Sequence, residues 1–293
     1  MISLLQVILL GLVQGAAELL PVSSSAHVIV AEKLMGINPA GPQAMFLLAM
    51  LHTGTMFSML IYFRKSWWES YFSSAERFRS AAWRAFAATA ITGAVGFGLI
   101  KAIEKVFLGG TATGDVEELS NNLYLVACAL AAAGGLIIAS GLGRGGRSVQ
   151  DAPQPRLGEV TLGTSCLMGL AQGLCLPFRG LSRSGTTISI GLMAGAGRRR
   201  AEEFSFALAI IITPAVIARE FLRLHKAFPE SMHSGTIWSL ARPGLIGLVA
   251  SFIAGLVALA LLSRWLDQGR WHYFGFYCLA AAAAVLALAA GGL

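Results

Sequence analysis

Long apolar windows without charged residues recur along the chain and limit its fold more than any other feature. A bilayer core about 30 Å thick needs about 20 such residues per helix. Six windows approach or reach this length, and they cover residues 44–63, 85–100, 122–143, 204–218, 243–263 and 271–293. Charged residues make up only 13% of the chain, against roughly 25% in soluble domains. The sequence therefore predicts an all-α integral membrane protein with six transmembrane helices.

Two further apolar regions are interrupted in their middle by proline, serine and glycine. The first covers residues 2–31 around PVSSS, and the second covers residues 160–196 around PFRGLSRSG. A break that faced lipid would leave backbone groups unsatisfied at a cost of several kcal/mol each. We therefore predict that both regions are re-entrant helix hairpins, buried in protein or lining a cavity.

The two interrupted regions resemble each other. GLVQG begins at Gly11 and GLAQG begins at Gly169, and each is followed by a proline, a Ser-rich turn and three of the predicted spans. Three spans between the copies make the second copy enter the membrane from the opposite side. The prediction is a single membrane domain, 1–293, built from inverted-topology repeats at about 1–143 and 159–293 with a polar linker at 144–158.

The net charge of +7 is carried by short connections between apolar runs. This distribution favours anionic lipid headgroups and the positive-inside rule over a nucleic-acid partner. Segment 64–84 has five Arg and Lys residues, whereas segment 101–121 has two Lys residues against four acidic ones. We expect the first to be a cytoplasmic loop and the second an external loop, with both termini outside. The first hairpin then enters from the external side and the second from the cytoplasm.

The first break carries ionisable side chains that are costly inside a membrane and are therefore candidates for function. These are Glu18 and His27, and the alternative for each is a buried residue satisfied by a neighbouring helix. Pro21 favours the start of a new helix, which puts the N–H groups and hydroxyls of residues 23–25 at one spot. Because Ser24 and His27 are three residues apart, they share a helical face, where an imidazole base can reach the hydroxyl.

The second break supplies the complementary positive charge. Residues 182–187 begin a second half-helix, and Arg183 lies four residues before Thr187 on the same face. Arginine suits bidentate contact with phosphate oxygens, and a helix N-terminus adds N–H donors. Two alternatives are open, namely that Arg183 anchors lipid headgroups or pairs with Glu18. The two breaks together are most simply described as a buried anion site.

The two motifs resemble those of a known family. Q-x-x-x-E-x-x-P-x-S-S-S-x-H runs from Gln14 to His27, G-x-S-R-S-G-x-T runs from Gly180 to Thr187, and together they resemble the undecaprenyl pyrophosphate phosphatases of the bacitracin-resistance type. The resemblance implies an enzyme that removes one phosphate from undecaprenyl pyrophosphate, recycles the lipid carrier for peptidoglycan synthesis and confers bacitracin resistance. It also implies a multi-pass protein of the bacterial cytoplasmic membrane whose active site opens to the external, periplasmic side.

The resemblance further implies roles for single residues. Ser24 matches the nucleophile, His27 the catalytic base, Glu18 the acidic motif and Arg183 the phosphate-binding motif. A scheme in which His27 is the nucleophile stays open. Arg179 stands where the family usually has proline, and is a candidate additional contact to pyrophosphate. The other residues implied to bind substrate are Gln14, Ser23, Ser25, Ser182, Ser184 and Thr187.

The expected ligands follow from the same resemblance. No tightly bound cofactor is expected, but a divalent cation, Mg²⁺ or Ca²⁺, is implied to assist, with Glu18 as its candidate ligand. The expected partners are a lipid pyrophosphate and membrane lipids, without nucleic acid, and a homodimer stays open. The alternative function is a transporter or flippase of polyprenyl phosphate, because discontinuous helices in inverted repeats also occur in secondary transporters. A nucleophile and a base on one helical face favour the enzyme.

Overall fold

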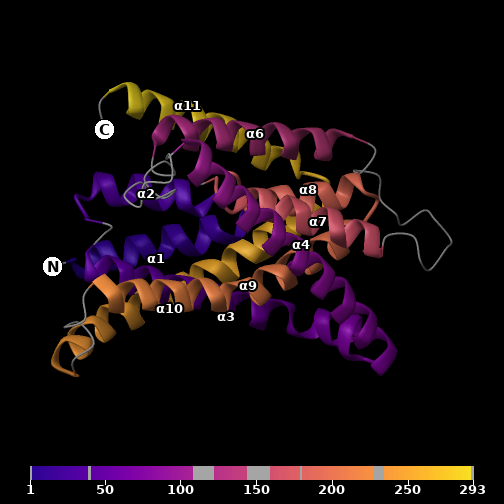
Figure 1. Ribbon diagram of the computed structural model, residues 1–293, viewed down its shortest axis with the longest axis horizontal. Helices are drawn as coiled ribbons and strands as arrows, with labels where there is room; N and C mark the ends of the chain where they lie inside the picture. The colour runs from indigo at the N-terminus through magenta and orange to yellow at the C-terminus, as the bar shows by residue number, and fades with distance from the viewer. Residues whose placement is uncertain are drawn as a thin grey trace.

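The structure is a computed structural model, and it describes residues 2–38, 41–107, 122–143, 159–178, 180–227 and 234–291. Within these residues every regular element is helical and no strand occurs (Figure 1). The helices long and apolar enough to cross a membrane are α3 (Pro42–Trp67), α4 (Ala75–Phe107), α6 (Leu123–Leu142), α9 (Arg198–Ala227), α10 (Ser234–Asp267) and α11 (His272–Ala290). For the described residues, the prediction of an all-α fold with six candidate membrane spans is confirmed.

Each interrupted region forms a pair of shorter helices. The pairs are α1 (Leu4–Leu19) with α2 (Ser24–Leu34), and α7 (Leu162–Cys175) with α8 (Arg183–Met193). Helix α1 begins and α2 ends toward the end of the molecule where both chain termini lie, whereas α7 begins and α8 ends toward the opposite end (Figure 1). The two turns, α1–α2 and α7–α8, therefore approach each other inside the bundle.

The prediction that residues 64–84 form a loop is wrong, because nearly all of this segment is helical. Helix α3 continues to Trp67, a π-helical segment follows at Trp68–Phe72, and α4 begins at Ala75. Charge-free windows stop at the first basic residue, but Arg64 and Lys65 lie in the last turn of α3, where cations complement the helix dipole and long side chains reach polar surroundings.

Local sequence signals explain several helix boundaries. Ser3 and Gln6 form a capping box at the start of α1, with Ser3 N donating to Gln6 Oε1 at 2.8 Å. Pro42 occupies the first turn of α3, where its missing N–H costs nothing. The side chains of Asn122 and Thr161 accept backbone N–H groups at the starts of α6 and α7.

Glycines of the repeated motif allow the short helices to pack closely on the long ones. A Cβ atom at Gly15 would lie 2.4 Å from the carbonyl oxygen of Ser251 in α10, and one at Gly169 would lie 2.3 Å from that of Ala88 in α4. Thr92 Oγ1 also donates to the carbonyl oxygen of Gly169 at 2.8 Å. Small residues of this kind let membrane helices approach backbone to backbone.

A buried carboxylate joins α3 to α9 at the end of the bundle away from the termini. Glu203 is fully buried and pairs with Arg199 at 2.9 Å and Arg200 at 3.0 Å. Ser66 donates to the same carboxylate, and Trp67 Nε1 donates to the Glu203 carbonyl oxygen at 3.1 Å. The ion pairs and the hydrogen bonds offset part of the cost of burying the Glu203 charge.

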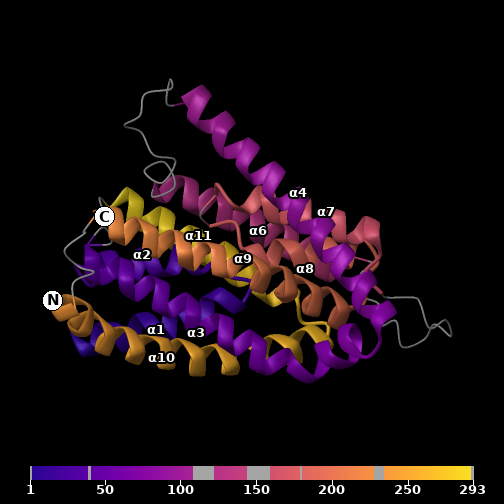
Figure 2. The same ribbon diagram turned by 60° about the horizontal axis from the view of Figure 1, so that its bottom comes forward.

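Helix α4 is the least buried of the candidate spans (Figure 2). The C-terminal half of α4 projects away from the other helices (Figure 2). Large apolar side chains such as Phe86 and Phe97 are exposed along the whole helix. Exposed apolar surface of this extent is typical of contact with lipid or with another protein.

Candidate active site

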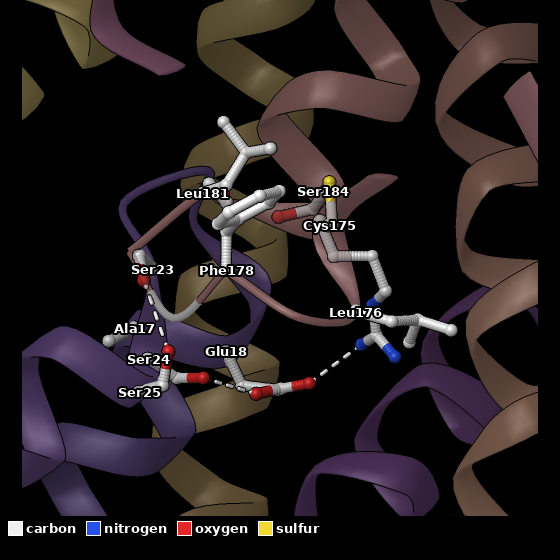
Figure 3. Close-up of a pocket in the computed structure, with 12 residues that line it drawn as sticks. Ala17, Glu18, Ser23, Ser24, Ser25, Cys175, Leu176, Phe178, Leu181 and Ser184 are labelled. Atoms are coloured by element: carbon white, nitrogen blue, oxygen red, sulfur yellow. Dashed lines mark hydrogen bonds and ion pairs between the residues drawn. The ribbon is translucent and has the colours of Figure 1, made fainter. Parts of the chain in front are cut away.

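The turns α1–α2 and α7–α8 enclose a pocket of about 220 Å³ (Figure 3). The first turn contributes Glu18 and residues 23–25 to its wall, and the second contributes Leu176, Phe178 and residues 181–184. Sequence segments more than 150 residues apart thus meet at one place, as the two motifs predicted.

Glu18 is the centre of the hydrogen bonds in this pocket. Its Oε2 atom accepts from Ser24 Oγ at 2.5 Å, and its Oε1 atom accepts from Arg183 Nη2 at 2.6 Å (Figure 3). The Oε2 atom also accepts from Gln14 Nε2 at 3.3 Å. The side chains of Glu18 and Arg183 are only 12% and 21% exposed. Pairing of Arg183 with Glu18, one of the alternatives that the sequence left open, is what the structure shows.

Two helices begin at the pocket. Ser23 is the N-cap of α2, and Ser182 is the N-cap of α8, where its Oγ atom accepts from Gly185 N at 3.2 Å. Helix α8 begins at Arg183, so the predicted start of the second half-helix is confirmed. The free N–H groups of both first turns add positive partial charge to the pocket.

The backbone of both turns takes conformations that most residues avoid. Ser23 has φ +68°, and among the described residues no other residue besides glycine has a positive φ. Such a conformation costs about 1–3 kcal/mol and persists only where its surroundings impose it. Gly180 has φ +106°, and a Cβ atom there would lie 2.4 Å from the carbonyl oxygen of Val126. Only glycine fits that position.

His27 lies beside the pocket but turns away from Ser24. Its Nδ1 atom is 2.8 Å from the Ser23 carbonyl oxygen, and its Nε2 atom is 2.7 Å from the hydroxyl of Tyr277 in α11. The two residues share a face of α2, as the spacing predicted, but the hydrogen bond of Ser24 goes to Glu18. Side chains in a helix lean toward the preceding turn, which brings the imidazole onto the Ser23 carbonyl.

The remaining candidates differ in their placement. Thr187 is fully buried, and its Oγ1 atom bonds the Arg183 carbonyl oxygen at 2.8 Å and Ser205 Oγ at 2.5 Å, so it joins α8 to α9 instead of lining the pocket. Arg179 lies outside the residues that the structure describes. The candidates that line the pocket are Ser23, Ser25, Ser182 and Ser184.

Sequence reasoning missed the apolar wall and the tyrosine. Leu176, Phe178 and Leu181 lie within the second interrupted region, and their alternation with its polar residues could have indicated a half-apolar pocket. Tyr277 is 250 positions from His27, and no local pattern links the two residues.

The pocket offers hard oxygen donors for a metal ion. Within the described residues no group of three or more His, Cys, Asp or Glu side chains could hold a metal by itself. Glu18 and the neighbouring serine hydroxyls supply the kind of oxygen atoms that Mg²⁺ and Ca²⁺ prefer, and Mg²⁺ is often bound by one or two carboxylates together with substrate phosphates. The residues therefore fit an ion that binds together with a phosphate ligand.

The class of site follows from these parts. The pocket brings together a guanidinium, two helix N-termini and a hydroxyl bound to a carboxylate inside a bundle of apolar helices. These groups suit a phosphate-bearing ligand. Residues 7–284 match the family described as Bacitracin resistance protein BacA. The chain belongs to this family, as its two motifs indicated, and it is a multi-pass membrane protein.

Relatives match along the whole chain. It is 50% identical to Undecaprenyl-diphosphatase 2 of Acinetobacter baylyi, over 98% of both proteins. It is 34% identical to the undecaprenyl-diphosphatase of Mycolicibacterium smegmatis, over 99% of this chain and 98% of the relative. It is 32% identical to that of a Nocardioides species, over 100% of this chain and 99% of the relative. The predicted resemblance is thus confirmed.

The positive φ of Ser23 predicts an unusual order of stabilities. Ser23→Gly should be more stable than Ser23→Ala by roughly 1 kcal/mol, because both lack the hydroxyl but only glycine adopts positive φ freely. Thermal unfolding of the purified variants in detergent measures the difference. The matched control is Ser25, which lies in the first turn of α2, where Ala should be the more stable. The same order at both positions would contradict the strain at Ser23.

Proposed function

We propose that the chain hydrolyses undecaprenyl pyrophosphate to undecaprenyl phosphate and inorganic phosphate, with Ser24 as the nucleophile. Its membership of a family whose relatives are named undecaprenyl-diphosphatase supports a phosphatase. The observation that carries the proposal is the 2.5 Å hydrogen bond from Ser24 Oγ to Glu18, beside the Arg183 guanidinium. The reaction would recycle the lipid carrier for peptidoglycan synthesis and thereby confer bacitracin resistance.

Charge complementarity supports binding of the pyrophosphate in the pocket. Arg183 uses Nη2 for Glu18, and the other N–H groups of its planar fork suit phosphate oxygens. The N-termini of α2 and α8 add backbone donors. Glu18 and the phosphate oxygens would together hold a divalent cation. Such an ion would neutralise the negative charge that develops in phosphoryl transfer.

The proposed reaction has two steps. Ser24 Oγ attacks the terminal phosphorus, the bond from that phosphorus to the bridging oxygen breaks, and undecaprenyl phosphate leaves. The Ser24 proton passes to Glu18 Oε2, its hydrogen-bond partner. Water then attacks the phosphorus of the phosphoserine, the bond from that phosphorus to Ser24 Oγ breaks, the proton on Glu18 returns to Ser24 Oγ, and inorganic phosphate is released. The hydrogen bond favours Glu18 as the proton acceptor over His27, the base that the spacing alone suggested.

The pocket volume supports recognition of the headgroup and not of the whole lipid. Sites that enclose a drug-sized ligand measure about 300–1,000 Å³, whereas this pocket measures about 220 Å³. The eleven prenyl units would lie outside it, against apolar side chains. Leu176, Phe178 and Leu181 stand at the wall where the lipid chain would leave.

We place the protein in the bacterial cytoplasmic membrane with its pocket open to the external side. The α1–α2 and α7–α8 pairs would be re-entrant hairpins of the inverted repeats 1–143 and 159–293. Arg199 and Arg200 lie at the start of α9, beside the end of α3 with Arg64 and Lys65. Basic residues gathered at the end of the bundle away from the termini support a cytoplasmic location for that end.

The transporter alternative is not favoured. Transport of a phosphate lipid needs the cationic groups but has no use for a serine hydroxyl bound to a carboxylate. Phosphate release from a polyprenyl pyrophosphate by the purified protein in detergent separates the two functions directly. A protein that binds this lipid but releases no phosphate, with or without Mg²⁺ or Ca²⁺, would contradict the phosphatase.

Arg183→Lys should lower kcat/KM for phosphate release more than tenfold, a loss above ~1.4 kcal/mol. Lysine keeps the charge but cannot reproduce the planar fork that contacts Glu18 and phosphate together. Arg77→Lys, at an exposed position of α4, is the matched control and should leave the rate unchanged. If the lysine variant keeps more than a tenth of the wild-type rate, the bidentate contact is wrong.

Ser24 and Glu18 should behave as one catalytic unit. Ser24→Ala, Glu18→Gln and the double variant should lose similar amounts of activity, because effects within a catalytic unit are strongly non-additive. His27→Ala should retain more activity than either single variant. Phosphate release at matched expression provides the comparison. If Ser24→Ala combined with His27→Ala loses no more activity than His27→Ala alone, His27 is the base. An active Ser24→Ala beside an inactive His27→Ala would make His27 the nucleophile.

Cysteine labelling tests the orientation. Ser73 lies between the π-helical segment and α4, and Lys33 lies in the last turn of α2, at opposite ends of the bundle. A membrane-impermeant maleimide applied to intact cells should label Lys33→Cys but not Ser73→Cys, with the labelling of the unmodified protein subtracted. Permeabilised cells should label both. Labelling of Ser73→Cys alone from outside would invert the side on which the pocket opens.

A further inference from the structure

We propose that Tyr277 is a positioning residue of the active site, which holds His27 against the α1–α2 turn and so keeps Ser24 in place. The proposal rests on the proposed function for its catalytic consequence. Its structural basis is a chain of two hydrogen bonds, from the Tyr277 hydroxyl to His27 Nε2 at 2.7 Å and from His27 Nδ1 to the Ser23 carbonyl oxygen at 2.8 Å.

The direction of both hydrogen bonds follows from the chemistry of the groups. A carbonyl oxygen can only accept, so Nδ1 of His27 carries a proton. In the neutral imidazole Nε2 is then an acceptor, and the Tyr277 hydroxyl donates to it. The rings also stack, with centroids 5.7 Å apart and planes inclined by 13°. Tyr277 therefore holds both the tautomer and the orientation of the imidazole.

The Ser23 carbonyl is where this support is needed. Ser23 has φ +68° and lies directly before the proposed nucleophile. A strained backbone of this kind persists only when neighbouring groups hold it. The N–H of His27 Nδ1 is one such group, and Tyr277 fixes the ring that carries it.

Helix α11 contacts the same turn at a second point. Cys278, the residue after Tyr277, is fully buried, and its Sγ atom lies 3.4 Å from the Pro21 carbonyl oxygen. Farther along α2, Ala26 and Ile29 pack in a buried cluster with residues of α6 and α11. Two consecutive residues of α11, Tyr277 and Cys278, therefore hold the α1–α2 turn. The contact of Tyr277 with His27 is part of this packing and is not an isolated contact.

The closing experiment compares two tyrosines of α11. Tyr273 lies four residues before Tyr277, and both side chains are 48% exposed, so Tyr273→Phe is a matched control for Tyr277→Phe. Phenylalanine keeps the ring but removes the hydroxyl. Tyr277→Phe should lower kcat by about three- to tenfold, the range expected for one hydrogen bond, with KM little changed. Tyr273→Phe should leave both constants unchanged. An interfacial tyrosine that only contacts lipid predicts equal effects at the two positions and would overturn the proposal.

A spectroscopic measurement tests the hydrogen bond without relying on activity. In protein with ¹⁵N-labelled histidine, the His27 signals are assigned by their loss in His27→Asn. They should show the tautomer protonated at Nδ1, and the Nε2 signal should shift in Tyr277→Phe but not in Tyr273→Phe. An unchanged Nε2 signal in Tyr277→Phe would overturn the positioning role even in an active phosphatase. The expected shift in a protein that releases no phosphate would instead point to failure of the proposed function.

Discussion

The ion pair between Glu18 and Arg183 is the contact on which the site depends. It joins two turns that are 165 positions apart, at a nitrogen–oxygen distance of 2.6 Å. Neither charge could stay buried among apolar helices without a partner, because the loss of hydration would exceed what packing returns. Each residue therefore offsets the free-energy cost of burying the charge of the other. Together they leave a guanidinium face and a carboxylate-bound hydroxyl turned toward the same small pocket.

The long helices hold these turns by close backbone contact. Gly15, the last residue of GLVQG, and Gly169, the first residue of GLAQG, let α1 and α7 lie directly on α10 and α4. The helices then reach only to the middle of the bundle, where their turns meet. The half-helices that follow, α2 and α8, begin with free N–H groups at the pocket. The break between the helices of each pair thus places unpaired N–H groups at the pocket, where they can serve an anionic ligand.

The parts of the site that were predictable are those encoded within a few residues. The sequence predicted new helices near Val22, after Pro21, and at residues 182–187, and α2 and α8 begin within two residues of these positions, because the signals that start a helix act locally. The same reasoning put His27 on the face of Ser24 but could not choose its partner. The His27 imidazole could bond either the Ser24 hydroxyl or a backbone carbonyl of the preceding turn. In the structure it bonds the Ser23 carbonyl oxygen and the Tyr277 hydroxyl.

Composition and pattern alone determined the class of this protein: apolar windows, two interrupted hydrophobic regions and two motifs specify an all-α membrane protein of the bacitracin resistance family. These features are local or additive, so they can be recognised in the sequence without knowing how the helices pack. The tertiary structure alone decided that Glu18 bonds Ser24 and that α11 supplies Tyr277. Contacts across 250 positions depend on how helices pack, since the free energy of each pairing exists only when the whole bundle has formed.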